Sequence, residues 1–277
     1  MLPWVYEFHW TPFHIIFLSV FFTVFMVVAA TLTTALRRTA KAHATGAAEA
    51  ILWHSDFEDL APAARSCRHQ FTGDVAHRQC DHAFDCRTCP LHRTFPPLEG
   101  RGVSPLTLQE DVLGFAMPAD RMYHRGHTWV APDNEGNYLV GLDDFGKRII
   151  GTADAKELPP VGSRVTVNGT GWKVRTHKAA LRILSPVDGE VTAHGGAEDA
   201  WTLKVRPAEN GNGTEHLLRG AEVRPWIMRE MERLQVSFAT AGVGATLADG
   251  GELVPDFHRH FPKADWDGVL GQMFLEA

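Results

Sequence analysis

An apolar, uncharged stretch near the N-terminus differs from the rest of the chain. Residues 13–36 have the sequence FHIIFLSVFFTVFMVVAATLTTAL, and no Asp, Glu, Lys or Arg occurs between Glu7 and Arg37. A helix needs roughly 20 such residues to cross a bilayer. We therefore expect residues 1–36 to hold one transmembrane helix whose partner is the lipid bilayer. The aromatic residues expected at its interface with water are Trp4, Tyr6 and Trp10.

Two other interpretations of this stretch are a cleaved signal peptide and a buried core helix. A signal peptide has a basic start and an apolar run of roughly 7–15 residues. In this chain the residues before the apolar run contain Glu7 and no Lys or Arg. Arg37, Arg38 and Lys41 follow the apolar run, and positive charge stays cytoplasmic. We predict a single-pass protein of a bacterial inner membrane with a cytoplasmic C-terminal part. The Ala-rich residues 37–60 are expected to form a helical stalk.

The second half of the chain alternates apolar and polar residues in short runs. Turn signals such as Asp188-Gly189 separate these runs, which is typical of a β-sandwich or barrel. The expected strands are Thr128–Val130, Tyr138–Leu142, Arg164–Val167, Leu181–Leu184, Glu190–Thr192 and Trp201–Val205. In residues 220–235 apolar side chains recur at helical spacing instead, which predicts an amphipathic helix after the strands.

Two other segments flank the predicted β-region. Residues 96–120 are rich in proline and predict a linker. Residues 236–277 form an acidic tail in which Trp266, Leu270 and Met273 share one helical face. We expect a short helix there that docks on its own domain or on a partner.

All four cysteines of the chain fall within residues 61–95, at Cys67, Cys80, Cys86 and Cys89. A C-x₂-C pair with two further thiols suits tetrahedral zinc, and His69, His77, His82 and His92 are nearby substitutes. Four thiolates also suit an iron–sulfur cluster, although the x₁₂–x₅–x₂ spacing is not a ferredoxin spacing. The remaining alternative is no metal, with free thiols or two disulfides. The net charge of −6 gives no sign of nucleic-acid binding.

Four motifs in the β-region occur in the order found in a known family. They are the His124–Val130 strand, Gly141–Phe145 with Ile149–Gly151, Glu157–Gly162, and the Ser185–Val191 hairpin. Over residues 121–235 the chain resembles the H protein of the glycine cleavage system. The resemblance implies a mainly β, lipoyl-type barrel-sandwich hybrid with a C-terminal helix, here preceded by one transmembrane helix and a small cysteine-rich segment.

The resemblance also implies a lipoate attachment site. In the family a lysine in a tight hairpin carries lipoate through an amide bond, and counting back from Ser185 places that lysine at Lys178, followed by Ala179. Two neighbours depart from the family pattern: Arg175 replaces an acidic residue, and Trp172 replaces a small glycine. The alternative is an ordinary exposed lysine.

Three functions fit these patterns, and none of them is an enzyme. The first is a membrane-anchored accessory subunit that acts as a non-catalytic scaffold of a larger respiratory or other redox complex, with other subunits as partners. The second is a membrane-tethered lipoyl carrier with Lys178 as the swinging arm. The third is an electron-transfer subunit with an iron–sulfur cluster.

Overall fold

The computed structural model describes residues 11–44, 57–95, 111–176, 180–208, 213–240, 261 and 264–275. The chain divides into two units, Met1–Trp53 and His54–Ala277, which are described separately. Lys178 and parts of the predicted stalk, linker and tail lie outside the described residues.

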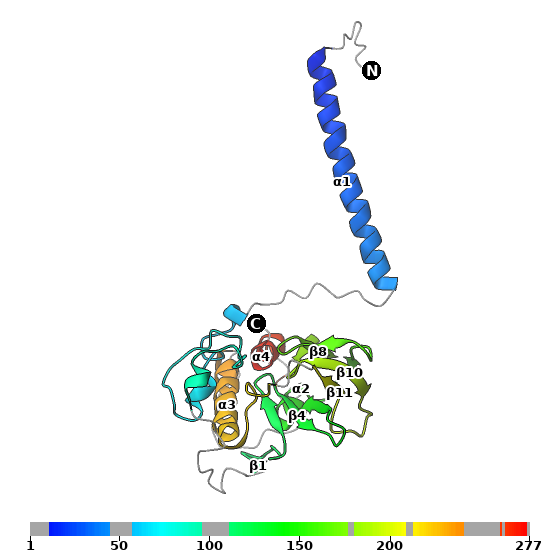
Figure 1. Cartoon of the computed structure of the whole chain (residues 1–277). Coiled ribbons are helices and arrows are strands. Elements are labelled where there is room, and N and C mark those ends of the chain that lie inside the picture. The colour runs from blue at the N-terminus through cyan, green and yellow to red at the C-terminus, as the bar shows by residue number, and fades with distance from the viewer. Residues whose placement is uncertain are drawn as a thin grey trace. The chain divides into compact units, whose positions relative to one another are not determined.

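Helix α1, Pro12–Ala44, is the helix of the first unit (Figure 1). Its part from Pro12 to Arg37 is long and apolar enough to cross a membrane, and no other described helix is. The hydroxyl groups of Thr23 and Thr31 donate to main-chain carbonyls one turn earlier, at 2.7 and 3.0 Å. These bonds satisfy the hydroxyl donors internally, as an apolar surrounding requires.

The described residues of the second unit include three antiparallel sheets (Figure 1). The strands are β1 Asp111–Val112, β2 Phe115–Ala116, β3 Met122–His124, β4 Thr128–Pro132, β5 Tyr138–Leu142, β6 Ala155–Glu157, β7 Arg164–Val165, β8 Thr170–Arg175, β9 Ala180–Leu184, β10 Gly189–His194 and β11 Leu203–Pro207. One sheet has the order β3-β4-β5-β11-β10-β7, another β6-β8-β9, and β1 pairs with β2.

The two larger sheets share one hydrophobic core. Val140 and Val205 come from the six-stranded sheet, and Trp172 and Ile183 come from the three-stranded sheet; all four belong to the same buried cluster. This shared core is the mainly β, sandwich-type arrangement that the apolar alternation predicted.

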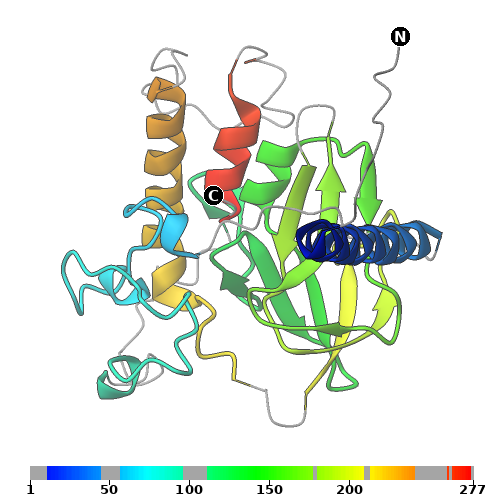
Figure 2. The same ribbon diagram turned by 90° about the horizontal axis from the view of Figure 1, so that it is seen from above.

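The helices of the second unit pack together beside the sheets (Figure 2). They are α2 Asp144–Ile150, α3 Val223–Thr240 and α4 Trp266–Met273, with 3₁₀ turns η1 Phe57–Asp59, η2 Arg68–Gln70, η3 His92–Thr94 and η6 Gly220–Glu222. The side chains of Asp143 and Asp265 cap α2 and α4 by accepting from main-chain amides three residues later. Trp266, Leu270 and Met273 are buried in the shared core, so the tail helix docks on its own domain.

Several elements differ from those expected. Strands β6 and β8 and helix α2 were not predicted, and α3 begins at Val223 and continues to Thr240. Residues 111–116, which were expected to be linker, form the β1–β2 hairpin, whose Val112 and Phe115 are buried in the core. We call residues 111–240 the β-domain and residues 57–95 the cysteine segment.

Candidate functional site

Main-chain hydrogen bonds within the cysteine segment bring Cys67 and Cys80 into neighbouring backbones. The Cys67 amide donates to Arg78 O at 2.8 Å, and the Cys80 amide donates to Arg65 O at 2.6 Å. Ala83 and Phe84 then take left-handed conformations, with φ of 46° and 60°, which turn the chain before Cys86. The Cys89 amide donates to Cys86 O at 3.2 Å, so the C-x₂-C pair lies on one turn.

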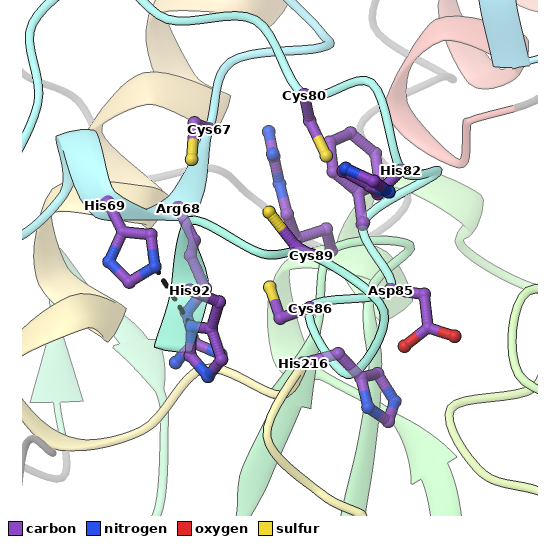
Figure 3. A pocket seen from close by; sticks show the side chains of 12 residues that line it. Cys67, Arg68, His69, Cys80, His82, Asp85, Cys86, Cys89, His92 and His216 are labelled. Carbon is purple, nitrogen blue, oxygen red and sulfur yellow. Dashed lines mark hydrogen bonds between the residues drawn. The ribbon is translucent and has the colours of Figure 1, made fainter. Parts of the chain in front are cut away.

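All four cysteines line one cavity of about 20 Å³, the cysteine pocket. Figure 3 shows their sulfur atoms pointing into the same space. The cysteines are free thiols. Among the described residues, no group of three or more His, Cys, Asp or Glu side chains has a geometry that could hold a metal ion. The structure therefore brings the predicted sulfur donors to one cavity without closing them into a coordination shell.

The candidate histidine ligands differ in their positions. His69 and His92 line the cysteine pocket and hydrogen-bond to each other, with 3.0 Å between Nε2 and Nδ1. His82 also lines the pocket, whereas His77 does not. His216 of the β-domain lines it as well, and its Nε2 lies 2.7 Å from Pro186 O. Sequence spacing gave no signal for His216, because it is far along the chain from the cysteines.

Burial controls the protonation of these groups. Burial raises the pKa of the Cys86 thiol to about 12 and also raises the pKa of Cys67. Burial, together with the nearby Arg68 charge, lowers the pKa of His69 to about 4. At neutral pH the thiols of Cys67 and Cys86 and the imidazole of His69 are therefore neutral, and a cation bound by these thiols would have to displace their protons.

Two buried arginines join the cysteine segment to the β-domain. Arg68 donates through Nε to Glu222 at 2.8 Å and through Nη2 to the same carboxylate, and both side chains are buried. Arg125 donates to Ala64 O at 3.1 Å and to Ser66 O, and its guanidinium lies 3.9 Å from the centre of the Phe84 ring. Both arginines line the cysteine pocket. The pocket is thus built by two parts of the chain.

The β8–β9 hairpin frames the predicted lipoate site. Arg175 pairs with Ala180 at the ends of the two strands, and Lys178 lies between these two residues in the sequence. Arg175 forms an exposed ion pair with Glu157, at 3.0 Å, which partly neutralises the charge that departs from the family pattern. Trp172 is buried in the core and its Nε1 has no partner in the described part of the chain.

A third group of ionisable residues is buried within the β-domain. His127 Nδ1 lies 3.0 Å from Asp143, and its Nε2 lies 3.8 Å from Glu230. Burial lowers the pKa of His127, but the two carboxylates outweigh it and raise the pKa to about 9. The ring stacks on Phe145 and Trp226. The group is enclosed by the core, and it holds the β3–β4 turn against α2 and α3.

Comparison with known proteins identifies similarity over the β-domain. The family model described as Glycine cleavage H-protein matches residues 121–229. The glycine cleavage system H protein of Burkholderia vietnamiensis is 33% identical over 117 residues, which cover 38% of this chain and 92% of that protein. That of Shewanella frigidimarina is 35% identical over 106 residues, which cover 34% and 82%. A solved H protein from Mycobacterium marinum is 23% identical, with a TM-score of 0.33, covering 38% and 94%.

Proposed function

Because this chain belongs to the glycine cleavage H-protein family through residues 121–229, we propose that it is a membrane-tethered, non-catalytic lipoyl carrier. Lipoate is joined to Lys178 by an amide bond, and the β-domain presents it to partner proteins. The supporting observation is the β8–β9 hairpin, whose strands stay paired up to Arg175 and Ala180 on either side of the lysine connection. Both of these flanking residues are exposed.

The apolar part of α1 supports the membrane tether. The Arg37, Arg38 and Lys41 cluster supports a cytoplasmic β-domain at a bacterial inner membrane. Four free cysteines agree with a reducing compartment. In this arrangement the lipoyl arm serves partners at or near the membrane surface.

A second candidate function is the non-catalytic scaffold of a larger membrane complex, respiratory or otherwise redox. The observation that favours it is the buried arginine contacts that fix the cysteine segment on the β-domain. The cysteine segment lies outside the part of the chain that matches the family model, because the match begins at residue 121. In a scaffold Lys178 stays unmodified.

The cysteine pocket supports a metal-binding role in addition, with zinc as its occupant or, in an electron-transfer subunit, an iron–sulfur cluster. Four thiols lining one cavity are the supporting observation. The two occupants differ in colour, since a cluster absorbs broadly in the visible range and zinc does not. Metal and sulfide analysis of the full chain separates them.

Lipoylation in vitro tests the carrier proposal. The full chain in mild detergent is incubated with lipoate, ATP and a lipoate ligase, and the mass of the peptide that contains residue 178 is measured. Wild type and the matched control Lys173→Arg are expected to gain one lipoyl group, and Lys178→Arg none. Absence of incorporation in a folded wild-type chain contradicts the carrier proposal and favours the scaffold. If Arg175→Glu is then lipoylated, the reversed charge is the cause.

A further inference from the structure

Each of the four cysteines that line the cysteine pocket supplies one sulfur donor. Cys67 directly precedes η2, Cys80 follows the Ser66–Gln79 bridge, and Cys86 and Cys89 lie on one turn. Two of the histidines that line the pocket, His69 and His92, hydrogen-bond to each other. The four thiols share the pocket with His82 and His216 (Figure 3), and four thiolates suit a closed tetrahedral ion site.

The size of the pocket distinguishes one ion from a cluster. A single water molecule needs about 10–15 Å³ of cavity volume, and the cysteine pocket has about 20 Å³. One ion with inward-moving sulfur atoms fits this space. An iron–sulfur cluster brings several iron and sulfide atoms of its own, so it needs more room than one ion does.

The buried guanidinium of Arg125 is an independent indication that the pocket holds negative charge. Its side chain is only 3% exposed, and its hydrogen bonds go to main-chain oxygens and to the Ser66 hydroxyl. Its Nε has no partner, and no carboxylate in the described residues forms an ion pair with it. Glu230 acts on it only through space and is itself paired with Arg233. A buried cation without a counter-ion is strongly unfavourable.

We propose that the cysteine pocket binds one zinc-class divalent ion through Cys67, Cys80, Cys86 and Cys89, and that the resulting complex is the counter-ion of Arg125. Binding forms four metal–sulfur bonds and releases the four thiol protons, with no change of oxidation state. A divalent ion with four thiolates carries two negative charges, which compensate the buried guanidinium. The ion thereby cross-links the cysteine segment beside Arg125 of the β-domain.

Metal analysis of the full chain, purified in mild detergent, tests the ligand set. Wild type and His92→Gln are expected to hold one zinc-class ion per chain, and Cys89→Ser less than a tenth of that. Iron with acid-labile sulfide overturns the proposal, as do four free thiols without metal affinity, two disulfides, or equal metal loss in His92→Gln.

Removal of the ion from wild type tests its role without a variant that fails to fold. A strong chelator is expected to increase the rate of proteolytic cleavage within residues 57–95 more than tenfold, while the β-domain stays resistant. Added zinc restores protection. An unchanged cleavage rate after complete metal removal would show that the ion does not stabilise the cysteine segment, and this result would overturn the proposed role of the ion.

Chelator competition tests the Arg125 coupling. Arg125→Gln is expected to weaken zinc affinity at least tenfold, and Arg125→Lys, which keeps the charge, to retain most of it. The matched control is Arg87→Gln, because Arg87 of the same segment already pairs with Asp85 and Asp188. Equal affinity in Arg125→Gln and wild type contradicts the counter-ion role. These results do not depend on Lys178. A chain that binds zinc but is not lipoylated would support the zinc proposal and contradict the carrier proposal.

Discussion

The buried Arg68–Glu222 pair should contribute strongly to the docking of the cysteine segment. Arg68 is 5% exposed and Glu222 is 1% exposed, and the two residues are 154 positions apart. Replacement of Arg68 by Met leaves the Glu222 carboxylate buried without its cation. Removal of one partner from a buried ion pair typically costs 3–5 kcal/mol, and we expect a loss of about 4 kcal/mol in the free energy of unfolding.

The double variant separates the pair from the surrounding packing. Glu222→Gln keeps the shape of the side chain but removes its charge, so it leaves Arg68 buried as an unpaired cation. When Arg68→Met and Glu222→Gln are combined, no unpaired charge remains, and replacing both partners of a buried pair is often close to neutral. We therefore expect the double variant to be more stable than the sum of the single changes predicts, by about 2–3 kcal/mol.

An exposed pair in the same β-domain provides the control. Arg206 and Glu190 are 2.7 Å apart but 60% and 42% exposed, so Arg206→Met should cost less than about 1 kcal/mol. Urea unfolding of the full chain in mild detergent, followed by the fluorescence of its eight tryptophans, measures these differences. A cost for Arg68→Met as small as that for Arg206→Met, or strictly additive single changes, would show that the Arg68–Glu222 pair does not stabilise the docked segment.

Three further changes test the core of the β-domain. The pKa of His127 is about 9 in the folded chain against an unfolded value near 6.5. Its stabilising contribution is therefore complete below pH 6.5 and lost as the pH rises through 9. Relative to His127→Gln, wild type should lose about 3 kcal/mol of unfolding free energy between pH 6.5 and 9.5; a pH-independent difference contradicts this. Trp172→Phe should lower the free energy of unfolding by less than about 1.5 kcal/mol, because the buried indole Nε1 is unpaired. Trp172→Ala should lower it by about 3–5 kcal/mol in the same urea assay. Equal losses for the two variants would show that the ring does not fill the core. In Gly189→Ala the new Cβ would lie 2.3 Å from the main-chain oxygen of Arg206, so calorimetry should show a loss of about 1–3 kcal/mol, and an unchanged melting temperature would contradict the pairing of β10 with β11.

The fold class was predictable because its signals are local. Strand β5 matches the expected Tyr138–Leu142 run, and short alternating runs with turns between them indicated the sandwich. Strand β8 was missed because only Trp172 and Val174 give it an apolar face. Helix α2 is seven residues long, and its start signal, the Asp143 cap, lies directly after a strand motif. The predictions of the family and of a mainly β fold are confirmed.

The candidate site was only partly predictable. The cysteines cluster in the sequence, and the structure places all four at one cavity. The residues that complete the pocket come from distant positions: Arg125 and His216 belong to the β-domain, and the carboxylate of Glu222 reaches Arg68 across 154 positions. Such pairs form only when the segments dock, and a single sequence carries no periodicity or spacing that announces them. Lys178 follows from the family motif and stays a prediction.

The mass of the peptide that carries Lys178, in protein purified from its native membrane, tests the central claim most directly. We expect this peptide to carry one lipoyl group and the peptide with Lys173 to be unmodified. An unmodified Lys178 in native material would contradict the carrier function and leave the chain as a non-catalytic scaffold.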